Sequence, residues 1–198
     1  MGAVRVLLIG GTSNAGKSTV AQVIARRLGY EYVSTDRLGR HPGRPWTTTE
    51  QDVPEHVVEH YRSLTEVQLV EALLKHYERM WPRVEELIST HTPAPGVGLL
   101  LEGSGVWPEY VVRLGAPYTA AVWLTADKRV LADRIHDTSR YDELTADRRL
   151  LVDKFLARSL DYQSAMLDQL NRLHLAHLDT TNLTLSATVE NVRALTDG

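Results

Sequence analysis

The segment Gly11–Ser18 has the residue types and the spacing needed to bind phosphate groups. It matches the pattern G-x-x-x-x-G-K-[ST], whose glycines let the backbone curl so that successive N–H groups point at phosphate oxygens. Lys17 can reach the β- and γ-phosphates of a nucleotide, and the hydroxyl of Ser18 can bind magnesium. We therefore expect ATP and Mg²⁺ as cofactors, with the nucleotide bound by Gly11, Thr12, Ser13, Asn14, Ala15, Gly16, Lys17, Ser18 and Thr19.

The sequence on both sides of this loop fits the same interpretation. Residues 4–9 form an apolar run, which is typical of a parallel strand buried on both faces. After the loop, Val20, Ile24 and Leu28 follow a helical spacing, and Gly29 stands where a helix often ends. The sequence therefore supplies the strand–loop–helix context that a phosphate-binding loop requires.

Further apolar segments alternate with helical patterns along the chain. Strands are expected at residues 31–35, 97–101, 118–124 and 173–178, with helices between them. This alternation predicts an α/β fold, the three-layer α/β/α arrangement of P-loop NTPases with a five-stranded parallel sheet, in a single domain over residues 1–198. Ligands of such sheets gather at the carboxyl ends of the strands.

Acidic residues follow two of these expected strands. Asp36 and Arg37 come after the second strand, and Glu102 and Gly103 come after the third, so they share an edge with the phosphate-binding loop. Asp36 could also serve only as a turn residue, because aspartate is common in turns. A structural role is harder to find for Glu102, because an unpaired carboxylate in an apolar strand costs several kcal/mol.

A basic loop follows the second strand. Arg37, Arg40 and Arg44 lie within eight residues and are followed by Trp46. Guanidinium groups form bidentate bonds with carboxylates and phosphates, so these residues are candidates for binding an anionic substrate. The alternative is a solvated basic loop whose charge is partly neutralised by nearby acidic residues. For an uncharged or cationic substrate, stacking on Trp46 would matter more.

At this point the sequence resembles the P-loop small-molecule kinases of the nucleoside-monophosphate-kinase group. The resemblance implies that Asp36 is a catalytic base or orients the acceptor hydroxyl, and that Glu102 is a ligand of a magnesium-bound water or a second acid. It makes Arg134 and Arg140 candidate lid arginines, with Arg134 catalytic and Arg140 on the nucleotide; the alternative is that both are solvated helix residues. It also implies a helical substrate-binding insertion over about residues 38–92 and a lid over about 137–147.

The same motifs resemble several families within that group. The segments GGTSNAGKST and LEG look like those of nicotinamide riboside and uridine kinases. The form GGxSxAGKS also looks like chloramphenicol phosphotransferase, and 2-phosphoglycerate-kinase-like proteins are a further match. Shikimate kinases fit less well, because they carry a glycine triplet where this chain has Glu102-Gly103-Ser104.

The composition restricts the other possibilities. The 198 residues include 22 basic and 25 acidic side chains, a net charge of −3, so we expect no nucleic-acid or membrane partner. The absence of cysteine excludes disulfides and thiolate chemistry. The first apolar run is far too short for a signal peptide or membrane span, so we expect a cytoplasmic protein, either a monomer or a homodimer.

His56 and His60 match a zinc-peptidase pattern, but no third ligand is evident, and an ordinary exposed helix is the preferred interpretation.

Two functions are compatible with these motifs and this composition. The first is an ATP-dependent phosphotransferase that moves the γ-phosphoryl group onto an alcohol group of a small, anionic metabolite, or alternatively of a nucleoside such as nicotinamide riboside. The second is a nucleotide-binding switch or hydrolase without a small-molecule acceptor. The sequence favours the kinase, because the N-K-x-D motif of GTPases is absent and the loop after Asp36 is large enough to hold an acceptor.

Overall fold

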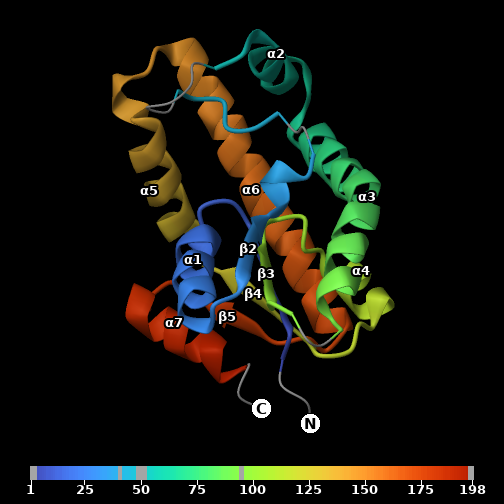
Figure 1. Cartoon of the computed structure of the whole chain (residues 1–198). Coiled ribbons are helices and arrows are strands. Elements are labelled where there is room, and N and C mark those ends of the chain that lie inside the picture. Colours follow the sequence, from blue (N-terminus) through green and yellow to red (C-terminus); the bar gives the residue numbers. More distant parts are fainter. Residues whose placement is uncertain (1–3, 40–41, 48–52, 94–95, 196–198) are drawn as a thin grey trace.

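The computed structural model describes residues 4–39, 42–47, 53–93 and 96–195. At its centre is a parallel five-stranded sheet in the order β2-β3-β1-β4-β5 (Figure 1). The strands are β1 (Val6–Gly11), β2 (Glu31–Ser34), β3 (Leu99–Glu102), β4 (Thr119–Thr125) and β5 (His177–Asp179). Every residue of β1 is buried, as expected of a central strand covered on both faces. The predicted α/β fold with a five-stranded parallel sheet is confirmed.

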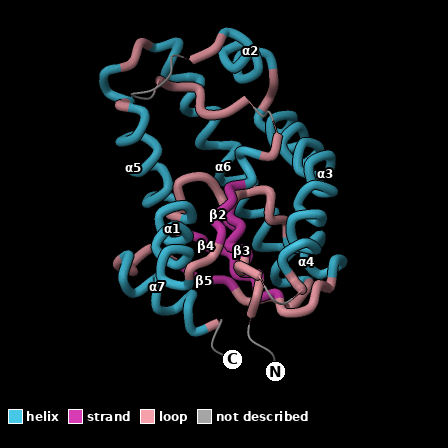
Figure 2. Tube along the Cα trace, viewed as in Figure 1, coloured by secondary structure: helices cyan, strands magenta, loops and turns pink. Residues whose placement is uncertain are grey.

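Helices cover both faces of this sheet (Figures 1 and 2). They are α1 (Lys17–Leu28), α2 (Glu55–Ser63), α3 (Glu66–His91), α4 (Pro108–Leu114), α5 (Lys128–Ser139), α6 (Ala146–Arg172) and α7 (Leu185–Ala194). Leu7 and Ile9 of β1 pack toward α1 and α7. Val6 and Leu8 point the other way, toward α3, α4 and α6. This alternation along one strand produces the three layers.

A third apolar cluster lies beyond the carboxyl edge of the sheet. It joins α2, the end of α5 and the first half of α6, and its members include Trp46, Tyr61, Ile135, Val152 and Phe155. Because this cluster has its own buried core, it holds α2 above the ends of the strands (Figure 1). Phe155 of this cluster lines the same cavity as the loops after β1, β2 and β3.

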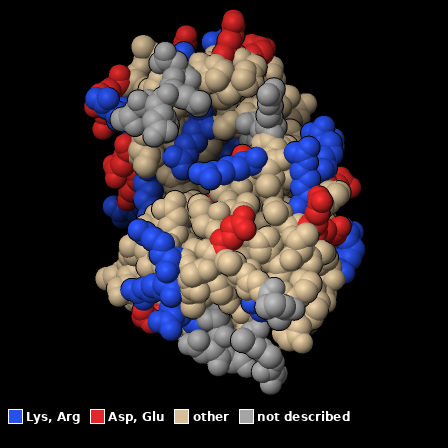
Figure 3. Space-filling view, viewed as in Figure 1, with Lys and Arg blue, Asp and Glu red and all other residues tan. Residues whose placement is uncertain are grey.

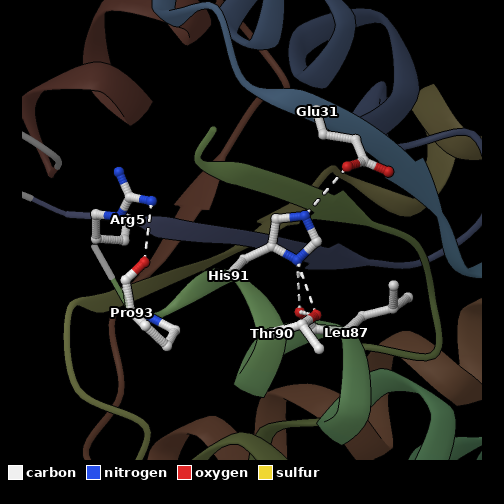
Figure 4. A network of polar contacts seen from close by, with 6 residues as sticks. All are labelled: Arg5, Glu31, Leu87, Thr90, His91 and Pro93. Atoms are coloured by element: carbon white, nitrogen blue, oxygen red, sulfur yellow. Dashed lines mark hydrogen bonds and ion pairs between the residues drawn. The ribbon is translucent and has the colours of Figure 1, made fainter. Parts of the chain in front are cut away.

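The far end of α3 is fixed at the opposite edge of the sheet (Figure 4). Nε2 of His91 lies 3.1 Å from Oε2 of Glu31, at the start of β2. Nδ1 of the same ring lies 2.7 Å from the carbonyl oxygen of Leu87. Arg5, just before β1, donates a hydrogen bond of 3.3 Å to the carbonyl oxygen of Pro93. These contacts hold the C-terminal end of α3 near the amino ends of the strands, so the rest of the helix extends toward their carboxyl ends.

The last strand differs from the expectation. The strand expected at 173–178 is shorter and begins later, at His177, because His174 has a φ of 52° and so interrupts an extended chain. Pro82 lies inside the continuous α3. Trp81 and Val84 on either side of it remain on one buried face, which holds the helix together there. Within the part of the chain that the structure describes, no helix has the length and apolar character needed to cross a membrane.

Candidate active site

A cavity of about 490 Å³ lies at the carboxyl ends of the strands. Figure 3 shows the hollow in this face, with lysine and arginine side chains along its rim. Parts of α1, α3, α5, α6 and the loops after β1, β2 and β3 line it. The residues predicted from the sequence that line it are Ser13, Asn14, Gly16, Lys17, Ser18, Thr19, Asp36, Arg44, Glu102 and Arg134.

Backbone conformation shapes the phosphate-binding loop. Gly11 has a φ of 137°, and a Cβ there would lie 2.3 Å from the carbonyl oxygen of Leu124 on the neighbouring β4. Gly16 has a φ of 92° and begins α1 without any side chain capping the first N–H groups. Those N–H groups, together with the positive end of the helix dipole, are therefore available for an anion.

Lys17 extends back over this loop. Its Nζ donates a hydrogen bond of 2.7 Å to the carbonyl oxygen of Thr12. Burial lowers the pKa of Lys17, and the carboxylates of Glu102 and Asp36 partly oppose that effect. The ammonium group is thus desolvated and lies in the field of two acids, next to the place where phosphates would bind.

Glu102 is a buried carboxylate, only 2% exposed, at the end of β3. Its Oε1 accepts hydrogen bonds from the hydroxyl of Ser18 at 3.1 Å and from the hydroxyl of Tyr32 at 2.9 Å. Burial and the Glu102 charge raise the pKa of Tyr32, so the phenol keeps its proton and remains a donor. Sequence reasoning missed Tyr32. It lies on β2, two residues before Ser34, and β2 is the neighbour of β3, which ends at Glu102.

The oxygen atoms of Ser18 and Glu102 fit a magnesium ion. Magnesium prefers oxygen ligands and is usually held by one or two protein groups together with substrate phosphates. Among the described residues, no group of three His, Cys, Asp or Glu side chains could hold a metal, and this applies also to His56 and His60 on α2. The donor set therefore suits an ion that arrives with a nucleotide.

Asp36 lines the same cavity as Glu102, in the short 3₁₀ turn Thr35–Arg37, and it is exposed. His76 of α3 also lines this part of the cavity. Burial lowers the pKa of His76, with a further contribution from Arg79, whereas the charge of Asp36 acts in the opposite direction. Asp36 is thus a solvent-accessible carboxylate on the wall of the cavity.

Arg134 of α5 is fastened to the phosphate-binding loop. It donates a hydrogen bond of 3.2 Å to the carbonyl oxygen of Asn14, while Nδ2 of Asn14 donates to the carbonyl oxygen of Arg134 at 3.3 Å and to Thr138 at 3.1 Å. Arg134 and Asn14 also line a second cavity of about 210 Å³, which extends toward Leu183 and Leu185 before and at the start of α7. The two cavities share Asn14, Gly16, Thr19 and Arg134 among their lining residues.

Helix α6 brings a third arginine, besides Arg44 and Arg134, into the main cavity. Arg158 is 4% exposed, and it donates a hydrogen bond of 2.6 Å from Nη1 to the hydroxyl of Tyr61 on α2. Its neighbour Ser159 accepts a hydrogen bond of 2.7 Å from the hydroxyl of Thr12 in the phosphate-binding loop. Sequence reasoning missed Arg158. The spacing Leu151, Phe155, Arg158 and Tyr162 would have shown a charged residue on the buried face of this helix.

A family of known proteins shares the sequence pattern that builds this site. The family model described as an AAA domain matches residues 7–153. The chain belongs to this AAA-domain family. No curated protein sequence matches the chain.

Solved structures share the fold of this AAA-domain protein at low sequence identity. A gluconokinase from Sinorhizobium meliloti 1021 is 19% identical with a TM-score of 0.59, and the match covers 100% of this chain and 94% of that one. A sugar kinase from Janibacter sp. HTCC2649 is 19% identical with a TM-score of 0.53, over 98% and 95% of the two chains. A shikimate kinase from Bacteroides thetaiotaomicron is 14% identical with a TM-score of 0.52, over 98% of each chain. These proteins carry different kinase names, so the likeness shows a P-loop kinase fold and does not identify an acceptor.

Other predicted residues lie elsewhere in this AAA-domain protein. Arg37 is exposed and is not among the described residues that line the cavity, and Arg40 lies outside the described residues. Arg140 ends α5 with its side chain 73% exposed and forms an ion pair of 2.6 Å with Glu143. Trp46 is buried against Phe155, with ring centroids 4.8 Å apart, so its ring is part of the core. The structure therefore does not bring Arg37, Arg140 or Trp46 to the cavity.

Proposed function

We propose that this protein is an ATP-dependent kinase that transfers the γ-phosphoryl group to a hydroxyl group of a small anionic molecule. The observation that carries the proposal is the single cavity that joins Lys17 and the phosphate-binding loop to Asp36 and Arg44. A nucleotide on the loop and an acceptor beside Asp36 would share one cavity, as direct phosphoryl transfer requires.

The chain's own residues can perform most of the reaction. The acceptor hydroxyl oxygen attacks the γ-phosphorus, and the bond to the oxygen that bridges the β- and γ-phosphates breaks, giving a phosphate ester and ADP. Asp36 orients the hydroxyl and takes its proton. Lys17 and the N–H groups at the start of α1 stabilise the charge on the phosphates. Ser18 and Glu102 would hold the magnesium ion, which neutralises phosphate charge when bound.

The second cavity is assigned to the nucleotide base. It is lined by Asn14 and Arg134 and also by Leu183 and Leu185, so a flat ring could lie against an arginine and apolar side chains. In this assignment Arg134 lies between base and phosphates, residues 38–92 form the acceptor-binding insertion, and residues 137–147 form a lid. Arg140 would reach the nucleotide only if its ion pair with Glu143 opened.

The alternatives receive less support. A nucleoside acceptor would benefit from an aromatic stacking surface, but Trp46 is only 4% exposed. A switch or hydrolase needs no acceptor chamber, whereas the cavity continues past the phosphate-binding loop to Asp36 and Arg44. Membership of the nucleoside-monophosphate-kinase group is supported by Asp36 and Glu102 at neighbouring strand ends.

The test is ATP consumption across a panel of hydroxylated metabolites, with the mass of each product confirmed. Because two structural neighbours are named a gluconokinase and a sugar kinase, sugars and sugar acids come first in the panel. An acceptor-dependent product that carries one added phosphate supports the proposal. ATP hydrolysis at the same rate with and without every acceptor would support the switch or hydrolase instead.

A further inference from the structure

Arg158 is a buried cation without an acidic partner. Its side chain lines the main cavity, the residue is 4% exposed, and its Nε has no hydrogen-bond partner. No carboxylate of a described residue forms an ion pair with it. A buried charge without a counter-charge costs several kcal/mol, so such groups are usually paired or wait for a ligand.

The guanidinium group is held firmly in its position. It lies over the ring of Phe155, with its carbon 4.4 Å from the ring centroid, and 5.6 Å from the ring centroid of Tyr61. Nη1 donates to the hydroxyl of Tyr61, and that hydroxyl donates in turn to the carbonyl oxygen of Gly43 at 3.0 Å. Arg158 is thus connected through Tyr61 to the loop that carries Arg44. A positioned arginine of this kind loses little freedom when it binds an oxyanion.

Arg158 also shares the acceptor part of the cavity with Asp36. Tyr77 of α3 is a cavity residue whose pKa is raised by burial; the charge of Arg158 lowers it and that of Asp36 raises it. Both charges therefore act on the phenol of Tyr77, which lines the same cavity as Arg158 and Asp36. A small molecule beside Tyr77 could present a hydroxyl to Asp36 and an anionic group to Arg158.

We propose that Arg158 binds the anionic group of the acceptor, and that the acceptor is a small hydroxy compound with a carboxylate or phosphate group. Arg158, braced by Tyr61, is the specificity-determining residue in this assignment, and the exposed Arg44 assists from the rim. The inference rests on the proposed kinase function and names its substrate class. The alternative is that Arg158 contacts the γ-phosphate of ATP. The hydrogen bond from Tyr61 to Gly43 argues against it, because this bond connects Arg158 to the loop that carries Arg44.

The experiment compares acids with their uncharged counterparts. The probes are D-gluconate with D-glucitol, D-glycerate with glycerol, and glycerol 3-phosphate, which separates phosphate from carboxylate recognition. Each is tested for a shift in the melting temperature of the ADP–Mg²⁺ complex and, with ATP, for a phosphorylated product by mass. We expect an acid to bind and react, and its uncharged counterpart to do neither.

The variant Arg158→Gln should then raise KM for that acid at least tenfold, because charge-assisted hydrogen bonds are lost. KM for ATP should stay within about twofold of the wild-type value, because the variant removes a contact with the acceptor and none with ATP. Arg172→Gln is the matched control, since Arg172 is the exposed last residue of the same helix. Tyr61→Phe keeps the ring and removes only the hydroxyl group that positions Arg158, so it should raise KM for the acid by a smaller factor. It decides the question if Arg158→Gln does not fold.

Several outcomes overturn the inference while leaving the kinase proposal intact. One is phosphorylation of an uncharged probe with equal efficiency by wild type and Arg158→Gln. Another is a variant that loses affinity for ATP but not for ADP, which would assign Arg158 to the γ-phosphate. A panel in which no acid binds the ADP complex or reacts also overturns it. If instead ATP with Mg²⁺ does not raise the melting temperature of the wild type, the kinase proposal itself has failed.

Discussion

The two halves of the cavity are built in different ways. The half that we assign to a nucleotide consists almost entirely of consecutive residues, from Gly11 to Thr19, whose shape is set by backbone conformation and by pairing with β4. The half that we assign to an acceptor combines Asp36, the loop around Arg44, and side chains from α3 and α6 that are far apart in the sequence. The first half uses N–H groups, which any sequence supplies once the glycines are in place. The second depends on particular side chains, and these can change without altering the fold.

The largest effect should come from the nucleotide half. We expect Lys17→Ala to lower kcat/KM about 10²- to 10³-fold, because a charged donor at the phosphates is lost. The rise in melting temperature caused by ATP–Mg²⁺, which reflects about 2.7 kcal/mol at a hundredfold excess over Kd, should largely disappear. Lys75→Ala, an exposed lysine outside the cavity, is the control. A normal nucleotide response in Lys17→Ala would contradict the assignment of this half.

Asp36→Asn should separate the two halves. We expect kcat to fall about 10²-fold, the usual scale for a positioned acid–base group. The melting-temperature rise with ATP–Mg²⁺ should remain, because Asp36 lies on the acceptor side. Asp168→Asn, at an exposed site on α6, controls for the loss of an acidic group. Turnover close to that of the wild type would mean that Asp36 is only a turn residue.

This difference also explains what the sequence could reveal. The phosphate-binding loop and its strand and helix could be predicted, because their pattern is local and the backbone conformation demands it. Glu102 could be predicted because a carboxylate stands out in an apolar strand. The acceptor residues could not: Arg158 meets Tyr61 only because α2 packs across α6, 97 positions apart in sequence. Trp46 shows the same limit, since its neighbour Phe155 comes from a distant helix.

Arg44→Gln should have a smaller effect than either change above. Arg44 lines the cavity but is exposed, and its guanidinium lies 5.8 Å from the ring centroid of Trp46. Water screens such a charge, so we expect KM for an anionic acceptor to rise about tenfold or less, and less than in Arg158→Gln. Steady-state kinetics at several salt concentrations would measure it, and the effect should shrink as salt rises. An effect on KM for ATP but not for the acceptor would move Arg44 to the nucleotide half.

The smallest effect concerns the stability of the ligand-free protein. Because burial lowers the pKa of Lys17, folding disfavours its charged form. Lys17→Met should therefore raise the free energy of unfolding by about 1 kcal/mol at neutral pH while abolishing the nucleotide response. The wild type regains stability as the pH rises through the lowered pKa toward 10.5, so the difference should shrink there. Urea unfolding at pH 7 and pH 10 would measure it, and a destabilised Lys17→Met would show that the hydrogen bond to Thr12 outweighs the cost of burial.

The hydrogen bond from Thr12 to Ser159 has a consequence for how the two ligands influence each other. Ser159 holds the phosphate-binding loop, and the preceding residue, Arg158, faces the acceptor chamber. One turn of α6 thus contacts the phosphate-binding loop through Ser159 and lines the cavity through Arg158. If filling one site shifts this turn, the same coupling free energy must appear at the other, since linkage between two equilibria is reciprocal. The factor by which an acceptor tightens ADP binding would then equal the factor by which ADP tightens acceptor binding, and Thr12→Val would reduce both together.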